Sequence, residues 1–182
     1  MAPTPAATFE GIRAQLQSGS PAAIYVLHGA EGYFIDRLLT DFEALVPEGE
    51  RDFNLTVIYA PETAPDLVTE ACMRYPMMAE RQVVILKEAQ SVTAAYMDKL
   101  AGYASHPSSQ TVFVVASRGD SVKGAKFIKA AQASRAVFFE SRKLKDNQVS
   151  PAILKLVTQA GLTIDTKALA ILTDHIGTDL SR

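Results

Sequence analysis

The sequence has a single cysteine and no excess of basic charge. With only Cys72 among 182 residues, the chain can form neither an internal disulfide bond nor a cysteine-based metal cluster. Its 18 basic residues face 20 acidic ones, and this balance creates no strongly basic field that could hold nucleic acid by itself. These absences indicate a protein of a reducing compartment whose overall charge does not by itself favour binding to nucleic acid.

Targeting and membrane segments are also missing. The first residues, MAPTPAATFEG, contain no basic stretch followed by an apolar one, so they do not predict a secretory signal. No apolar run approaches the roughly 20 residues that a membrane-spanning helix needs. Since 48% of the residues are hydrophobic, the chain can bury one sizeable core and a small second domain. We therefore expect a cytoplasmic protein without membrane contact.

Apolar runs and helical patterns alternate along most of the chain. Buried strands are predicted at Ala23–His28, Leu55–Tyr59, Gln82–Lys87, Thr111–Ser117 and Ala136–Glu140. Helices are predicted between them, at Tyr33–Val46, Pro65–Tyr75, Thr93–Tyr103 and Gly124–Ala133. The strands do not alternate with polar residues, as is typical of strands covered on both faces. The pattern predicts an α/β fold with a doubly wound, parallel, five-stranded sheet.

The pattern changes after Glu140. Two amphipathic helices follow without a strand, separated by Gly161, and Asp165 is the expected N-cap of the second. We therefore predict an α/β domain over residues 1–141 and the start of a helical domain over residues 142–182. Because two helices bury little area by themselves, we expect the sequence to stop inside this second domain.

The turn after the first predicted strand lies where a phosphate-binding loop would be. That loop reads G-x-x-x-x-G-K-[ST], in which backbone N–H groups surround the phosphates and the lysine and hydroxyl complete the site. Counting from Gly29, Phe34 takes the place of the second glycine, Ile35 that of the lysine and Asp36 that of the hydroxyl residue. A bulky ring and a carboxylate oppose phosphate binding. The alternative is that Gly29 is an ordinary turn glycine of a doubly wound fold.

The strand that would support a magnesium ion is altered as well. Such strands end in Asp-Glu, with the aspartate supporting the metal. Here the strand ends with Lys87 at the aspartate position, followed by Glu88. Both halves of a hydrolytic nucleotide site are therefore degenerate, and we expect no cofactor and no metal.

Several segments form a more specific pattern through their order along the chain. They read YVLHGAEGYFIDRLL, DFNLTVIYA, RYPMMAERQVVILKEAQ, TVFVVAS and LTIDTKALAILTDHIGTDLSR. From Ile24 to Arg182 the chain resembles the delta subunits of the bacterial DNA polymerase III clamp loader. The resemblance is strongest at Gly29–Asp36, at Asp52–Asn54, in the short loop before the third strand and at Gly177–Arg182.

This resemblance implies an AAA+-like first domain without ATPase activity, followed by a helical lid domain and then a collar domain that is absent here. It implies a subunit that is itself non-catalytic but belongs to the DNA polymerase III holoenzyme, a nucleotidyltransferase complex active in DNA replication. The implied partner is the sliding clamp (the beta subunit), which the family binds and helps to open for loading onto primed DNA. Other loader subunits would be contacted through the collar, and DNA only indirectly.

The resemblance also implies a clamp-binding element of two adjacent apolar residues. The matching positions here are Met77 and Met78, flanked by Tyr75 and Pro76, where the family more often has Leu-Phe. Methionine is flexible and polarisable, and it adapts well to an apolar pocket. From the residues alone, the alternative is that both methionines fill gaps in the core, which is the commoner role of methionine.

Two other functions compete with this interpretation. One is a nucleotide-dependent AAA+ switch or ATPase, which the substitutions in both halves of the nucleotide site oppose. The other is an unrelated doubly wound enzyme acting on a small molecule, which needs a polar cluster at the carboxyl ends of the strands. The polar residues available there are His28, Glu31, Glu88 and Ser117, and they form no recognised catalytic set.

Overall fold

The computed structural model describes residues 7–143, 146–159 and 161–176. Its centre is a five-stranded parallel sheet in the order β2-β3-β4-β1-β5. The strands are β1 (Ile24–His28), β2 (Leu55–Tyr59), β3 (Gln82–Lys87), β4 (Thr111–Ser117) and β5 (Val137–Glu140). Each agrees with a predicted run to within one residue, so the predicted parallel, doubly wound α/β fold is confirmed.

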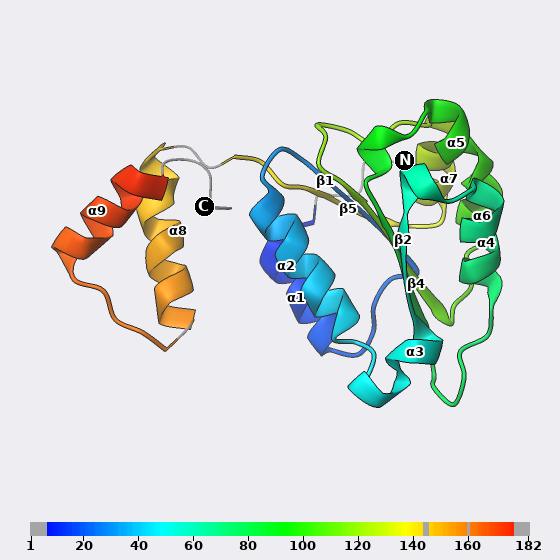
Figure 1. Cartoon of the computed structure of the whole chain (residues 1–182), viewed down its shortest axis with the longest axis horizontal. Coiled ribbons are helices and arrows are strands. Elements are labelled where there is room, and N and C mark those ends of the chain that lie inside the picture. The colour runs from blue at the N-terminus through cyan, green and yellow to red at the C-terminus, as the bar shows by residue number, and fades with distance from the viewer. Residues whose placement is uncertain (1–6, 144–145, 160, 177–182) are drawn as a thin grey trace.

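Helices cover both faces of the sheet (Figure 1). One face carries α1 (Phe9–Gln17) and α2 (Gly32–Glu43). The other carries α4 (Pro65–Met73), α5 (Ala94–Lys99), α6 (Ala101–Ser105) and α7 (Ala125–Ala133). Alternate strand residues enter the two cores, so Tyr25 and Leu27 face α1 and α2, whereas Ile24 and Val26 face the opposite layer. This two-sided burial explains the continuous apolar runs of β1, β3 and β4. The edge strands β2 and β5 were also predicted to be buried, which is wrong for most of their residues, because an edge strand has a neighbour on one side only: Ile58 is the one buried residue of β2 and Phe139 that of β5.

The parallel arrangement gives the sheet two different edges. All strands end at the carboxyl edge, where the turn from β1 to α2 lies, and all strands begin at the amino edge. The short helix α3 (Arg51–Asn54) leads into β2 at the amino edge, and the loop of residues 74–81 leads into the neighbouring β3. Three 3₁₀ turns complete the domain: η1 (Glu48–Glu50), η2 (Ala60–Glu62) and η3 (Ala89–Ser91).

Several helices differ from the predicted ones. The helix predicted to reach Tyr75 ends at Met73, because Arg74 is already extended with ψ 151°. The single helix predicted over Thr93–Tyr103 is divided into α5 and α6 at Leu100. Helix α1 was not predicted, since it contributes only Ile12 and Leu16 to the core as fully buried residues and thus has a short apolar stripe.

Two helices follow β5, as predicted: α8 (Asp146–Gln159) and α9 (Thr166–Ile176). Gly161 has a positive φ of 72° after α8, and Asp165 accepts a hydrogen bond from the Ala168 N–H at the start of α9. The two helices lie beyond α1 and α2 in Figure 1. An ion pair between Lys155 and Glu10 connects α8 to α1.

The division at residues 141 and 142 into two domains stays a prediction. The motif at Gly177–Arg182, on which part of the family resemblance rests, lies outside the described residues. Across the described residues, no helix is long and apolar enough to cross a membrane.

Candidate functional site

The turn between β1 and α2 is closed by the segment that follows β5. Gly29 has a φ of 136°, and a Cβ atom on it would lie 2.0 Å from the Ser141 carbonyl oxygen. Ser141 is held there because its N–H donates to the His28 carbonyl at 2.6 Å and its hydroxyl donates to the Glu31 carbonyl at 2.6 Å. Only glycine fits at position 29, because both the backbone conformation and the space exclude a side chain.

Several backbone donors of this turn are already used. The Gly29 N–H donates to the Gly119 carbonyl at 2.9 Å, and the Glu31 N–H donates to the Ser141 carbonyl at 3.2 Å. The Tyr33 N–H donates to the carboxylate of Glu31, at 3.0 Å. A phosphate-binding loop needs such N–H groups free and directed at the ligand. In this turn they stabilise the protein's own structure instead.

The side chains at the three altered phosphate-loop positions lie in three different environments. Phe34 is half-buried and packs edge-on against Phe9, with ring centroids 5.1 Å apart. Ile35 is buried in the core between α2 and the sheet. Asp36 is exposed and accepts hydrogen bonds from Arg118 at 2.9 Å. An arginine–carboxylate pair therefore occupies the place where a hydroxyl would hold magnesium.

The two charged residues at the end of β3 also lie in different environments. Lys87 lies 3.5 Å from Glu43 of α2, whereas Glu88 is exposed and has a left-handed φ of 61°. Within the described part of the chain, no three histidine, cysteine, aspartate or glutamate residues are grouped so that they could hold a metal ion.

Two of the four polar residues that an unrelated enzyme would need lie side by side. His28 and Ser117 are paired at the ends of β1 and β4. The Ser117 hydroxyl accepts from the Gly119 N–H, and the buried Nδ1 atom of His28 has no hydrogen-bond partner in the described structure. The histidine thus lacks the hydrogen bond at Nδ1 that orients a catalytic imidazole in a triad.

The loop of residues 74–81, at the amino edge of the sheet, presents apolar side chains to solvent. Met78 is 98% exposed, Met77 56% and Tyr75 83%. Neither methionine fills the core, so the core-packing alternative is wrong for both. Their role in binding a partner stays a prediction.

Two buried amides hold the backbone of this loop. Asn54 forms two hydrogen bonds of 2.8 Å with the Met77 main chain. Gln82 donates to the carbonyls of Ala71 and Arg74, at 3.1 and 2.6 Å. Neither amide was predicted to have this role. The one signal was the position of Asn54 inside the D-F-N segment, and its partner 23 residues away could not be read from the sequence.

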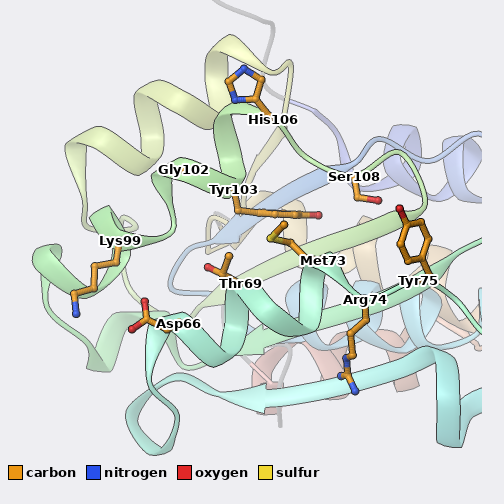
Figure 2. A pocket seen from close by; sticks show the side chains of 10 residues that line it. All are labelled: Asp66, Thr69, Met73, Arg74, Tyr75, Lys99, Gly102, Tyr103, His106 and Ser108. Carbon is orange, nitrogen blue, oxygen red and sulfur yellow. The ribbon is translucent and has the colours of Figure 1, made fainter.

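A groove of about 610 Å³ lies beside the loop, between α4 and α6 (Figure 2). Met73 and Tyr103 are central to it, and Tyr75 stands at one end. Burial raises the pKa of the Tyr103 hydroxyl and that of the neighbouring Cys72 thiol, so both groups stay protonated and uncharged. The groove thus combines an uncharged centre at Met73 and Tyr103 with the charged residues Asp66, Arg74 and Lys99.

Comparison with known proteins gives one consistent result. The DNA polymerase III delta subunit family matches residues 25–142. DNA polymerase III subunit delta of Bacillus subtilis is 25% identical over 162 residues, which cover 84% of this chain and 47% of that protein. The solved DNA clamp loader delta protein of Bacillus subtilis superposes with a TM-score of 0.78 at 24% identity, covering 96% of this chain and 54% of that one. The chain thus spans about half the length of these relatives.

More distant structures share the fold. A DNA polymerase III gamma subunit-related protein of Thermotoga maritima has a TM-score of 0.51 at 11% identity, covering 96% of this chain and 55% of that one. Domain III of the replication initiation protein DnaA of Thermotoga maritima has a TM-score of 0.59 at 13% identity, covering 95% of this chain and 77% of that one. The expected AAA+-like architecture and the expected family are confirmed.

Proposed function

The chain belongs to the family of DNA polymerase III delta subunits, and from this premise we propose that it binds the sliding clamp through Met77 and Met78 and helps to open it. The observation that carries the proposal is the exposure of two adjacent apolar side chains on a loop whose backbone is held in place. Tyr75 and Pro76 flank the contact. DNA is reached only indirectly, through the assembled loader.

The chemistry of the loop supports this proposal. Protein interfaces concentrate their energy in a few apolar anchors that enter pockets of the partner. Methionine side chains suit such pockets because they are flexible and polarisable. Pro76 supports their presentation, since its ring fixes φ and stiffens the chain immediately before Met77.

The proposed role needs no ATP hydrolysis by this chain. The N–H groups of Gly29 and Glu31 are engaged by other carbonyls, and Asp36 is paired with Arg118. A calorimetric titration with Mg-ATP should therefore give no saturable heat. Micromolar binding would instead favour the nucleotide-dependent switch.

Contacts with the rest of the loader are part of the same proposal. We expect them to involve a collar domain, and this chain spans about half of each relative. If a collar domain carries the assembly, residues 1–182 by themselves should sediment as a monomer. A stable oligomer of this chain would contradict the assignment of assembly to the collar.

The decisive experiment replaces both methionines. Each anchor of an interface contributes about 2 kcal/mol, so Met77→Ala with Met78→Ala should weaken clamp binding by about a thousandfold if the effects add, and by less if they do not. Binding is measured by surface plasmon resonance against the clamp of the same organism. Circular dichroism and the melting temperature should stay nearly unchanged, because both side chains are exposed.

The matched control is Leu162→Ala with Ile171→Ala, which removes two other exposed apolar side chains, 64% and 60% exposed, from the helical segment. This variant should bind the clamp like the wild type. If the methionine variant remains folded and binds at wild-type strength, the clamp contact lies elsewhere.

A further inference from the structure

We propose that Asn54 is a positioning residue for the clamp contact: its side-chain amide holds the Met77 backbone so that Met77 and Met78 are presented in one conformation. This inference rests on the proposed function of the two methionines. It adds a residue that does not itself face the clamp, because Asn54 is only 1% exposed.

The contact between Asn54 and Met77 has the form of a two-point bridge. The Asn54 Nδ2 group donates to the Met77 carbonyl oxygen, and the Met77 N–H donates to the Asn54 Oδ1 atom, both at 2.8 Å. A planar amide carries a donor and an acceptor side by side, so one side chain satisfies both main-chain groups of one residue. Aspartate has the same size but offers only acceptors when it is ionised.

These two bonds fix the chain on both sides of Met77. The N–H belongs to the peptide that joins Pro76 to Met77, and the carbonyl belongs to the peptide that joins Met77 to Met78. Fixing both planes restricts φ and ψ of Met77, and with them the direction of its side chain and the direction in which the chain enters Met78. Met78 has a φ of 55°, a left-handed conformation that is unfavourable for a non-glycine residue. Asn54 thus holds the residue directly before this strained position.

The place of Asn54 in the fold makes it a rigid support. It is the last residue of α3, directly before β2, and β2 pairs with β3, into which the loop runs. Gln82, the first residue of β3, binds the carbonyls of Ala71 and Arg74 where α4 ends. One amide thus holds the start of the loop and the other holds its middle. A loop that is ordered before binding loses less entropy when the clamp engages it.

The test compares Asn54→Ala and Asn54→Asp with a matched control, Asp98→Ala. Asp98 also makes two hydrogen bonds to main-chain groups, the N–H groups of Lys126 and Phe127, but it lies in α5, away from the loop. Clamp affinity is measured by surface plasmon resonance at a temperature where circular dichroism shows each variant folded. Exchange of the Met77 amide hydrogen is measured by NMR in the absence of the clamp.

Asn54→Ala should weaken clamp binding by about tenfold or more, since both main-chain groups of Met77 lose their partner. The Met77 amide should exchange faster by a similar factor. Asp98→Ala should lower the melting temperature without changing clamp affinity or Met77 exchange. Equal affinity of Asn54→Ala and the wild type would overturn the inference.

Asn54→Asp provides a readout that general destabilisation would not produce. Its carboxylate still accepts from the Met77 N–H but places a second oxygen against the Met77 carbonyl. A protonated carboxyl regains a donor, and burial beside a carbonyl raises its pKa. Clamp binding should therefore recover as the pH falls from about 7.5 to about 5.5, relative to the wild type at each pH. Absence of any recovery would contradict a role for the donor.

The outcomes separate this inference from the proposed function. If wild-type protein and Met77→Ala with Met78→Ala bind the clamp equally, the proposed function fails whatever Asn54 does. If the methionine variant loses binding and Asn54→Ala does not, the proposed function holds and the positioning role fails. If Asn54→Ala does not fold, the pH response of Asn54→Asp and its Met77 exchange decide the question.

Discussion

The two loops at opposite edges of the sheet use their backbone and side chains in opposite ways. In the turn after β1, main-chain donors of Gly29 and Glu31 bind other carbonyls of the protein, and the segment around Ser141 fills the space above them. In the loop before β3, buried side chains from elsewhere hold the main chain, and the loop's own side chains extend into solvent. The backbone donors of one loop are already bound within the protein, whereas the other loop presents apolar side chains to solvent.

This difference shows why function has to be argued from the site and not from the fold. Doubly wound sheets bind their ligands at the carboxyl edge, and the same scaffold supports many functions. Here the carboxyl edge carries a glycine turn, an exposed ion pair and dispersed charges, none of which leaves a cradle for phosphate. The exposed methionines lie at the amino edge, where a nucleotide site is not expected.

The largest effect on stability is expected in the turn between β1 and α2, which we call the closed turn. Gly29→Ala should destabilise the protein by about 3 kcal/mol or more, because the new methyl group would lie 2.0 Å from the Ser141 carbonyl oxygen and the backbone there is left-handed. Urea unfolding measures the change. Gly49→Ala is the control, since nothing lies within 4 Å of its Cβ position. An equal, small effect of both substitutions would show that the turn is not closed by Ser141.

A second, smaller effect on stability is expected at the loop of residues 74–81, which we call the open loop. Gln82→Leu should lower the free energy of unfolding by about 2 kcal/mol, since the carbonyls of Ala71 and Arg74 and the hydroxyl of Thr111 lose a buried partner. Gln132→Leu, on an exposed part of α7, should change it by less than about 0.5 kcal/mol. If both variants unfold at the same urea concentration, Gln82 does not support the loop.

The strands were predictable because each is a short apolar run, rich in β-branched or aromatic residues and bounded by turn residues. The ends of the helices were harder to predict. Nothing local separates α5 from α6 at Leu100, and the end of α4 depends on Gln82, which approaches from β3. Helix boundaries set by tertiary hydrogen bonds cannot be read from a helical pattern.

The candidate site was predictable in part. The altered positions Phe34, Ile35 and Asp36 follow directly from counting along the phosphate-loop motif. The closure of the turn by Ser141 and the support of Met77 by Asn54 join residues 110 and 23 positions apart in the sequence. Such pairings arise from the topology of the sheet, and a single sequence contains no local signal for them.

A third prediction separates stability from binding at the open loop. Met78→Gly should raise the free energy of unfolding by up to about 1 kcal/mol, because glycine adopts a φ of 55° without the strain that methionine bears. Clamp binding should fall nonetheless, since an anchor is lost. Arg135→Gly is a matched control with a φ of 62° on an exposed residue after α7, and it should stabilise the protein without affecting clamp binding. A stability loss for Met78→Gly would mean that the methionine side chain supports the fold.

The smallest effect is expected for the ion pair at the closed turn. Asp36 and Arg118 are 52% and 65% exposed, so solvent screens their attraction. Such a surface pair contributes about 0–1 kcal/mol. Asp36→Thr with Arg118→Ala should therefore leave stability nearly unchanged, even though it restores a hydroxyl at the position where a phosphate-binding loop has one.

This double variant also shows whether the backbone or the two exposed side chains of the turn exclude nucleotide. The backbone donors of Gly29 and Glu31 remain bound to the carbonyls of Gly119 and Ser141 after both side chains are replaced. Titration with Mg-ATP should consequently still give no saturable heat. If the variant did bind Mg-ATP, the exclusion would reside in two exposed side chains, and the turn would be a nucleotide site blocked only at its surface.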